Sequence, residues 1–233
     1  DSEVTEKYGI RKYGFHGTSH RYVSRKAAEF LGRPIEDLKI IVCHLGNGAS
    51  ISAVDGGVAV ETSMGLTPLQ GLVMGTRSGD VDPGLHTFLV REGGWDINDV
   101  DTMLNKRSGM LGLCGYTDMR DVEAQNDAGN ERTKLALDIY VHRLVSYIGS
   151  YYAVLGGLDA IVFTAGVGEN ASPVRAAVLN RLKHFGVTLD DAVNAVRSKQ
   201  PRAISTPESA VAALVIPTNE ELAMAQETLA IIS

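Results

Sequence analysis

The sequence predicts an α/β fold in which helices flank a mixed β-sheet. Two patterns lead to this fold class. Between residues 39 and 62, short apolar segments are separated by glycine-containing turns, which is typical of an antiparallel meander. From residue 130 onward, helix-like and strand-like segments alternate instead, and this alternation favours parallel strands joined by helices.

The first part of the chain is predicted to contain one helix and the strand meander. The helix covers residues 19–32, with Ser19 as its N-cap and Gly32 as its stop. The sequence Asp55-Gly56-Gly57 separates two alternating runs and is typical of a tight hairpin turn. Strands are therefore predicted for residues 39–45, 49–54 and 58–62.

A long loop at residues 67–83 opens the second part of the chain, and loops of this length in compact domains usually have a function. VGEN at residues 167–170 is predicted to be a turn. Ser172 as N-cap and Pro173 at the first helical position predict a helix that runs to about residue 185. Further helices are predicted for residues 84–91, 97–106, 130–155 and 218–233, and further strands for residues 158–166 and 210–217.

The composition narrows the classes of protein. Apolar residues make up 44% of the 233 residues, enough for a buried core. The chain has 22 basic and 28 acidic residues, and the net charge of −6 argues against nucleic acid or an anionic membrane as partner. No segment is long and apolar enough for a membrane span. The helix predicted at residues 130–155 is apolar on several sides, so we expect it to be buried or to lie in a subunit interface.

The cysteines and the N-terminal segment indicate the cellular compartment of the protein and whether its chain is processed. Cys43 and Cys114 match neither a disulfide framework nor a metal-ligand spacing, so we expect a reducing cytosol. The charged N-terminal segment is not a secretory signal. The sequence does not begin with methionine, so we expect a processed chain or a piece of a longer protein.

The segment YGFHGTSH places two histidines, His16 and His20, four residues apart among small residues. Histidines near a helix start are more often caps or packed polar groups than catalysts. A zinc site is disfavoured, because no third ligand is evident beside this pair.

Two glycine-rich turns follow predicted strands and could bring backbone N–H groups close to a phosphate. In FTAGVGENASPV, the segment GVGENA also fits the dinucleotide fingerprint, with Asp190 about twenty residues further on. In CHLGNGAS, His44 stands at a strand end before Gly46 and Gly48. Each segment also has a purely structural interpretation, as a turn from a strand into a helix for GVGENA and as a hairpin turn for Asn47-Gly48. The chain contains no P-loop signature.

The segment MGTRSGDVDPG places Arg77 among small residues, with Asp80 and Asp82 close by. A guanidinium in such a loop suits a phosphoryl group, because it binds two oxygens at once. A surface salt bridge between Arg77 and Asp80 explains the pattern equally well. Together with the glycine turns and isolated histidines, the arginine suggests phosphoryl transfer without a P-loop.

Five segments in this order, YGFHGTSH, HLGNGAS, TSMGLTPLQGLVMGTRSGDVDP, FTAGVGEN and IPTNEE, resemble the signature segments of the acetate kinase family. That family belongs to the acetate and sugar kinase/Hsp70/actin superfamily of actin-like ATPases, with two ribonuclease-H-like lobes and ATP between them. The resemblance implies that residues 1–220 are the second, C-terminal lobe. It also implies that residues 221–233 form a helix that returns to a first lobe absent from this sequence.

The resemblance also implies roles for individual residues. His20 is expected to be structural, and Met119 stands where the family often has an aromatic residue. The remaining implied roles are phosphoryl contacts for His16, His44 and Arg77, an acetate methyl pocket at Phe15 and Pro68, nucleotide contacts at Asn47, Gly48, Asp118, Met119, Arg120, Gly166, Val167 and Asn170, and a magnesium link for Glu220.

The implied reaction is reversible transfer of the ATP γ-phosphoryl group to acetate, giving acetyl phosphate and ADP with Mg²⁺. Acetate is already an anionic nucleophile, so the site needs positioning and positive charge rather than a general base. Arg77, His16 and His44 are expected to supply both. We further expect a cytoplasmic homodimer, inactive as this piece alone. The alternatives are a propionate or butyrate kinase, an NAD-dependent enzyme and a non-catalytic ATP switch like Hsp70.

Overall fold

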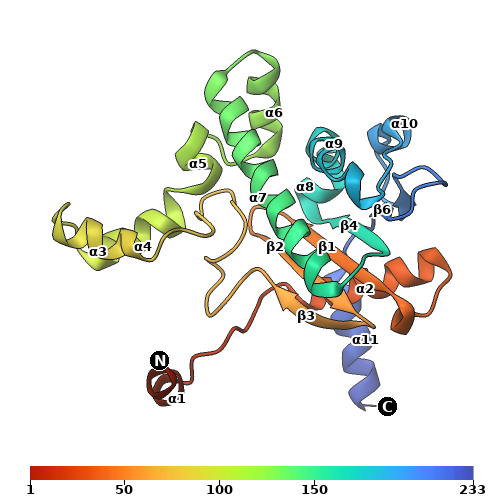
Figure 1. The fold of residues 1–233 in the computed structure, drawn as a ribbon, viewed down its shortest axis with the longest axis horizontal. Helices are drawn as coiled ribbons and strands as arrows, with labels where there is room; N and C mark the ends of the chain where they lie inside the picture. Colours follow the sequence, from red (N-terminus) through yellow and green to blue (C-terminus); the bar gives the residue numbers. More distant parts are fainter. Residues whose placement is uncertain (233) are drawn as a thin grey trace. The chain divides into compact units, whose positions relative to one another are not determined.

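A computed structural model of the chain describes residues 1–232 (Figure 1). The chain divides into two compact units. Unit 1 comprises Asp1–Phe15, Asn47–Ala49 and Ser63–Arg143, and unit 2 comprises His16–Gly46, Ser50–Thr62 and the chain from Leu144 onward. Ser233, the last residue of the helix predicted from the sequence, lies outside the described residues.

A six-stranded sheet with the order β3-β2-β1-β4-β6-β5 confirms the predicted mixed sheet. The central strands β1, β4 and β6 are parallel, and the pairs β2–β3 and β5–β6 are antiparallel. The two-residue β5 was not predicted. The strands are β1 (Lys39–Leu45), β2 (Ala49–Asp55), β3 (Val58–Thr62), β4 (Ala160–Thr164), β5 (Arg202–Ala203) and β6 (Ala212–Val215).

The predicted hairpin joins β2 to β3. Asp55 pairs with Val58, so the turn contains only Gly56 and Gly57. Both glycines have positive φ angles, 56° and 82°, which a two-residue turn of this hand requires and other residues rarely adopt.

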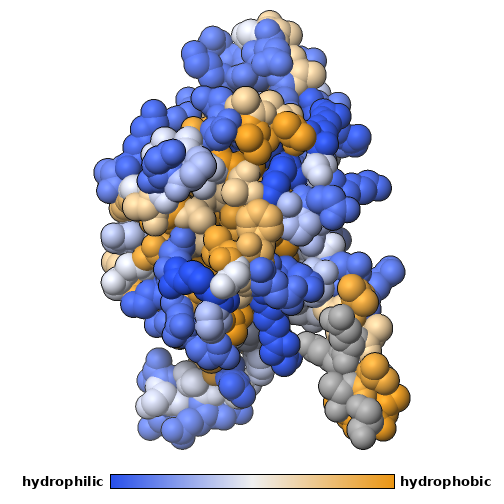
Figure 2. All heavy atoms as spheres, turned by 90° about the vertical axis from the view of Figure 1, so that its right-hand side faces the viewer, coloured by the Kyte–Doolittle hydropathy of each residue, from blue (hydrophilic) through white to orange (hydrophobic). Residues whose placement is uncertain are grey.

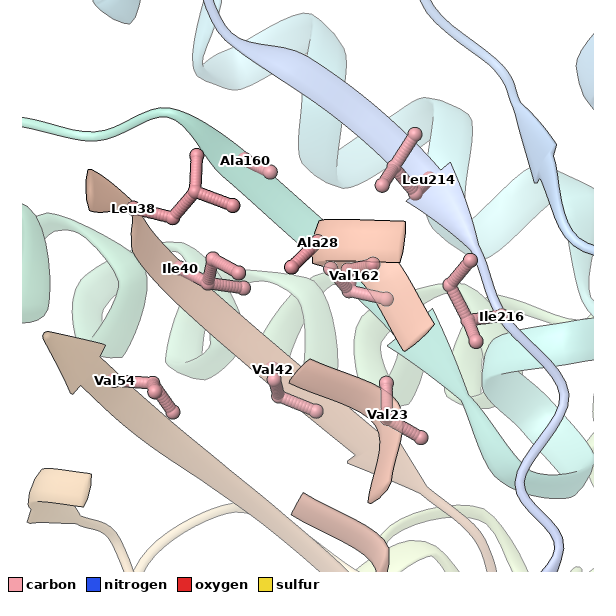
Figure 3. Packing of buried hydrophobic residues seen from close by; sticks show 11 residues of the cluster. Val23, Ala28, Leu38, Ile40, Val42, Val54, Ala160, Val162, Leu214 and Ile216 are labelled. Atoms are coloured by element: carbon pink, nitrogen blue, oxygen red, sulfur yellow. The ribbon is translucent and has the colours of Figure 1, made fainter. Parts of the chain in front are cut away.

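One face of the sheet packs against helix α2 (Gly17–Leu31). Alternate residues of each strand face this helix because side chains along a strand point to opposite faces in turn. Figure 3 shows these side chains together between the strands and α2. The core cluster consists of Val23, Ala27 and Ala28 of α2 with Leu38, Ile40, Val42, Val54, Ala160, Val162, Leu214 and Ile216.

Shorter helices follow the strands of unit 2, and the last of them packs against α2. The C-terminal half of the long helix α7 (Glu131–Leu155) lies on the face of the sheet opposite α2 (Figure 1). The other helices of this unit are η1 (Ile35–Asp37), α8 (Ala165–Asn170), α9 (Ser172–Arg181), η2 (Lys183–Phe185), α10 (Asp191–Ala195) and α11 (Glu220–Ile232).

The start of α2 differs from the prediction. The helix begins at Gly17, and its N-cap is His16 in the left-handed conformation (φ 59°) rather than Ser19. Ser19 does not cap the helix, because its hydroxyl is bound to the imidazole of His44. The predicted stop at Gly32 is confirmed as the C-cap.

The segment VGEN is helical, so the predicted turn there is wrong. It belongs to α8, whose first residue, Ala165, has a φ angle of 65°. The side chain of Glu169 reaches back and accepts a hydrogen bond from Ala165 N (3.0 Å), which stabilises this short turn of helix from within. The next helix has Ala171 as its N-cap instead of Ser172.

Unit 1 is mainly helical. Helices α3 (Gly84–Arg91) and α4 (Ile97–Lys106) have the predicted bounds, and residues 67–83 contain no helix or strand, as expected. Three short helices were not predicted: α1 (Ser2–Tyr8), α5 (Gly109–Cys114) and α6 (Met119–Asp127). Among the residues that the structure describes, no helix combines the length and the hydropathy needed to cross a bilayer.

Candidate active site

Three imidazoles cluster in unit 2 near the carboxyl end of β1. His44 lies next to last in β1, and its ring stacks on that of His16 with 4.0 Å between centroids and 16° between planes. The ring of His20 is tilted against both, at 6.5 Å from His16 and 6.1 Å from His44. The left-handed cap at His16 turns the chain into α2 and places the two histidines of YGFHGTSH beside the one from β1.

Hydroxyl groups hold each ring of this cluster. Ser50 Oγ lies 2.8 Å from His16 Nδ1 and 2.7 Å from His20 Nε2. Ser19 Oγ lies 2.8 Å from His44 Nδ1 and 2.9 Å from Thr218 Oγ1. Ser19 was predicted to be a helix cap, and Ser50 and Thr218 were given no role. All three lie in the segments YGFHGTSH, HLGNGAS and IPTNEE, but only the fold shows that their hydroxyl groups meet the histidines or each other.

Burial keeps two of the rings neutral. Desolvation, with smaller contributions from His44 and His16, lowers the pKa of His20 to about 3. Desolvation and the nearby His16 lower the pKa of His44 to about 4. At neutral pH both rings are uncharged. In this structure His44 is therefore a neutral hydrogen-bonding group and not the positive charge that was expected from the sequence.

The carboxyl ends of three parallel strands bring further predicted residues to the same edge of the sheet. His44 pairs in register with Thr164, the last residue of β4, and α8 with its Gly166, Val167 and Asn170 begins directly after it. Asn170 Nδ2 donates to the Gly166 carbonyl within α8 (2.8 Å).

The chain after β6 is tied to the same edge. Thr218 N donates to Glu169 Oε1 (3.3 Å), so one carboxylate holds both the start of α8 and the segment that leads to Glu220. Ligands of open α/β sheets usually bind outside such carboxyl ends.

A buried arginine fixes α8 to its neighbours. Arg175 of α9 is 1% exposed. Its guanidinium donates to the carbonyl of Gly168 (2.9 Å) and to both oxygens of Asn194 (2.8 and 2.7 Å). The amide of Asn194 donates in turn to the Ser172 carbonyl (3.0 Å). No motif in the sequence indicates this network, because a lone arginine on a helix usually faces water.

Glu220 is the first residue of α11 and is exposed. Mg²⁺ in phosphoryl-transfer sites is typically held by one or two carboxylates together with substrate phosphates. A single exposed glutamate at the sheet edge fits that mode. Within residues 1–232, no group of three or more His, Cys, Asp or Glu side chains could hold a metal by itself.

In unit 1, the structure brings Arg77 and Pro68 together. The Arg77 guanidinium donates to the Pro68 carbonyl (2.9 Å) and lies 3.6 Å from the Met74 sulfur. Within the described chain, Arg77 has no carboxylate partner. Asp80 instead pairs with Arg143 (3.4 Å), so the surface salt bridge between Arg77 and Asp80 is excluded.

The loop at residues 67–83 is ordered by its own backbone. Met74 N donates to the Arg77 carbonyl (3.2 Å), and Asp80 N donates to the Gly71 carbonyl (3.0 Å). Gly75 N donates to the carbonyl of Asn47 (2.9 Å), which ties the loop to the Asn47-Gly48 turn. These bonds hold Arg77 in place although no regular element carries it.

The remaining predicted residues lie on or beside helices of unit 1. Asp118 is the N-cap of α6 and forms an ion pair with Arg120 (2.5 Å). The hydrogen bonds from Arg120 lower the pKa of the Asp118 carboxyl to about 2. Met119 is 8% exposed, and Phe15 is half-buried directly before His16. The predicted residues thus fall into two groups, one on each unit.

Comparison with known proteins identifies the family. The profile of the acetokinase family matches residues 1–226. An acetate kinase of Streptomyces avermitilis is 56% identical over 232 residues, which cover 100% of this chain and 57% of that protein. The chain belongs to the acetokinase family. An acetate kinase of Desulfotalea psychrophila is also 56% identical, over 99% of this chain and 57% of its own length.

Solved structures of the family have the same fold. Porphyromonas gingivalis acetate kinase superposes with a TM-score of 0.96 at 45% identity, covering 99% of this chain and 58% of its own. A propionate kinase of Francisella tularensis gives 0.91, also at 45% identity, covering 97% of this chain and 58% of its own. The predicted actin-like ATPase fold class is therefore confirmed. The chain spans a little over half the length of these acetokinases.

The NAD-dependent alternative is wrong. Asp190, the acid that would bind the ribose, is the N-cap of α10 and accepts a hydrogen bond from Val193 N (3.0 Å). The acetokinase match leaves GVGENA as the strand-to-helix connection between β4 and α9 rather than a dinucleotide fingerprint.

Proposed function

We propose that the full-length protein transfers the γ-phosphoryl group of ATP to acetate, giving acetyl phosphate and ADP in a reversible reaction. The observation that carries this proposal is the convergence of His44, the α8 turn and the Thr218–Glu220 segment at the carboxyl ends of three parallel strands. The match to acetate kinases over the whole chain supports the same assignment.

The residues have the properties that this reaction needs. The acetate carboxylate attacks the phosphorus directly, so no protein nucleophile or general base is required. The transferring group is close to a planar metaphosphate, and its oxygens need donors and positive charge. Arg77 supplies a charged fork, while His16 and His44 offer imidazole donors from a stack held by hydroxyl groups.

Nucleotide and metal are proposed to bind through the residues that the family motifs indicate. Gly166, Val167 and Asn170 would contact the adenosine side, with Asp118, Met119 and Arg120 completing the nucleotide contacts. Asn47 and Gly48 would lie near the phosphates, and Phe15 and Pro68 would line the pocket for the acetate methyl group. Mg²⁺ would be held by Glu220 with the phosphates, where it neutralises their charge.

The length of the acid is a second question. The chain is 45% identical to both an acetate kinase and a propionate kinase of known structure, which keeps propionate as an alternative substrate and butyrate as a more distant one. Comparison of kcat/KM for acetate, propionate and butyrate decides among them, because each extra methylene has to fit the same apolar pocket.

Production of an acyl phosphate tests the proposal. The full-length protein with ATP, Mg²⁺ and acetate should give a product that hydroxylamine traps as a hydroxamate. Omission of acetate should abolish the signal without increasing ADP. Hydrolysis of ATP without any hydroxamate would instead support a non-catalytic switch of the Hsp70 type.

The partner and location are also proposals. We expect a homodimer that uses α7, since this helix carries exposed apolar residues such as Leu135 (60%) and Val154 (54%) beside its buried ones. Sedimentation of the full-length protein as a monomer at micromolar concentration would contradict this. We place the protein in the cytoplasm, because Cys43 and Cys114 are free and buried, as expected in a reducing compartment. We keep the expectation that neither nucleic acid nor an anionic membrane is a partner, because the net charge is −6.

A further inference from the structure

One hydroxyl group lies between two histidines. Ser50 is 0% exposed, and its Oγ contacts His16 Nδ1 and His20 Nε2 at 2.8 and 2.7 Å. Among residues 1–232, its hydroxyl has no other hydrogen-bond partner. A serine hydroxyl has one proton to donate and otherwise accepts. Two imidazole N–H groups facing Ser50 would leave that proton buried without an acceptor, so Ser50 donates to one ring and accepts from the other.

The surroundings of His20 show which ring donates a hydrogen bond to Ser50 and which ring accepts one from it. His20 is 4% exposed, and its Nδ1 has no hydrogen-bond partner among the described residues. Burial lowers its pKa to about 3, so the ring carries one proton. A proton on Nδ1 would be a buried orphaned N–H, which is rarer in proteins than a buried acceptor without a donor. The proton therefore belongs on Nε2, where Ser50 Oγ accepts it.

We propose that His20 and Ser50 fix the tautomer of His16. His20 Nε2 donates to Ser50 Oγ, the Ser50 hydroxyl donates to His16 Nδ1, and the ring proton of His16 therefore stays on Nε2. The same arrangement excludes a proton on His16 Nδ1. His20 and Ser50 are positioning residues that act through His16.

The consequence for phosphoryl transfer rests on the proposed function. With the proton on Nε2, His16 can donate a hydrogen bond to a phosphoryl oxygen from the nitrogen that does not face Ser50. The opposite tautomer would present a lone pair to that oxygen and repel it. A histidine held in the wrong tautomer can lose as much as about 10⁴-fold in kcat, so the orientation of this relay matters for turnover.

Nitrogen NMR of the full-length protein labelled with ¹⁵N-histidine tests the relay without any assay of activity. The signals of His16 and His20 are assigned by their loss in His16→Gln and His20→Gln. Protonated and unprotonated ring nitrogens have distinct shifts, and we expect Nε2 to be the protonated nitrogen of both rings. A proton on Nδ1 of either ring would overturn the proposal.

Variants separate positioning from a structural role. Ser50→Ala removes the donor to His16, so the NMR spectrum should show a mixture of His16 tautomers, and kcat should decrease about ten- to hundredfold with a smaller change in KM. The matched control is Ser52→Ala in the same strand, since Ser52 is 1% exposed and donates only to the Glu61 carbonyl (3.1 Å). Ser52→Ala should leave the His16 tautomer unchanged.

Substitution of His20 adds a rescue test. His20→Gln can still donate an amide N–H to Ser50 and should keep the His16 tautomer, whereas His20→Leu should lose it. Equal spectra of His16 in wild type, Ser50→Ala and His20→Leu would overturn the relay. If the tautomers are as proposed but no acyl phosphate forms, the relay stands and the proposed function fails.

Discussion

At the scale of single residues, the structure excludes the salt bridge that the sequence suggested for Arg77. Asp80, the salt-bridge partner that the sequence suggested, is engaged by Arg143, and the Arg77 guanidinium is held by the Pro68 carbonyl. A charged fork held in this way is available for an anion. In the full-length protein, Arg77→Ala should lower kcat roughly 10³-fold or more while ATP affinity changes little, as for arginines that stabilise phosphoryl transfer.

The comparison with lysine separates charge from geometry. Arg77→Lys keeps the charge but cannot bind two oxygens at once, so it should restore little of the lost kcat. Steady-state kinetics of both variants measure this. A decrease in kcat of less than about tenfold for Arg77→Ala would mean that the arginine only holds the loop through Pro68.

The buried histidines make the stability of unit 2 dependent on pH. The folded-state pKa values of His20 and His44, about 3 and about 4, lie below the ordinary value of 6.5. The unfolded chain therefore binds more protons below pH 6.5, and stability is lost as the pH falls from 6.5 toward 4. Each histidine should contribute a slope of about 1.4 kcal/mol per pH unit in the free energy of unfolding.

Urea unfolding of the full-length protein between pH 6.5 and 4.5 measures this slope. Carboxylates also titrate in this range, so the histidine contribution is read as the difference between wild type and His20→Gln. The variant should be less sensitive to acid by about one histidine slope. Parallel curves for the two proteins would show that His20 is already charged or solvated in the folded state.

At the scale of elements, the sequence predicted those segments whose signal is local. The helices at residues 84–91 and 97–106 have the predicted bounds. The glycine hairpin lies where it was predicted, with β2 one residue longer and ending at Asp55. Capping and turn chemistry act within a few residues, so such segments can be predicted locally. The segment 165–170 was mispredicted. Glu169 binds Ala165 N within the segment and also Thr218 N, which lies 49 residues further along the chain and is brought there only by the fold. Likewise, Ser19 was predicted to be the N-cap of α2 because the sequence does not show that the sheet places His44 beside it.

The same distinction applies to the candidate site. Motifs indicated His16, His44, Arg77 and the glycine turns, and the resemblance to the family gave them roles. Ser50 and Arg175 were missed, because their importance comes from what surrounds them after folding. Both are at most 1% exposed. Ser50 is the last residue of HLGNGAS, but only the fold shows that its hydroxyl meets His16 and His20.

The hydrogen bonds of Arg175 join α9 to α8 and α10, and they lead to a prediction about α8. Arg175→Met keeps the volume but leaves the Gly168 carbonyl and both oxygens of Asn194 without donors. We expect the free energy of unfolding to decrease by about 3 kcal/mol or more, since each buried unpaired group costs about 1–3 kcal/mol. The KM for ATP should rise more than kcat falls, because α8 carries the proposed adenosine contacts.

A matched control lies on the same helix. Arg181 is exposed, so Arg181→Met should change stability by no more than about 1 kcal/mol, the upper range for an exposed charged side chain. Urea unfolding and nucleotide titrations of the full-length protein measure both effects. An unchanged KM for ATP in Arg175→Met would show that the network stabilises the fold without positioning the nucleotide turn.

At the scale of the whole molecule, α11 carries apolar side chains that the described chain leaves open to solvent. Among the side chains of this helix that the structure describes, Ala223 alone is buried, and Figure 2 shows the exposed hydrophobic side chains of the helix in orange at the lower right. The exposed ones are Leu222 (41%), Met224 (54%), Leu229 (62%), Ile231 (84%) and Ile232 (75%). We propose that residues 1–220 form one lobe and that residues 221–233 contact a further part of the protein, as the family resemblance implies.

This division predicts how the 233-residue chain behaves when it is produced alone. The proposed adenosine contacts of α8 and the Asn47-Gly48 turn belong to the chain, so weak binding of ADP or ATP should survive. Turnover should not, because the relatives are much longer than this chain, which covers 57% of the Streptomyces avermitilis protein. Positioning and exclusion of water can supply roughly 7–11 kcal/mol of barrier reduction, and part of the site that provides them would be missing.

Calorimetry with ATP and Mg²⁺ measures nucleotide binding, and a hydroxamate assay of the isolated chain and of the full-length protein measures turnover. Activity of the isolated chain within about tenfold of the full-length protein, a difference of only about 1.4 kcal/mol in the barrier, would place the whole active site in these residues and refute the proposed division.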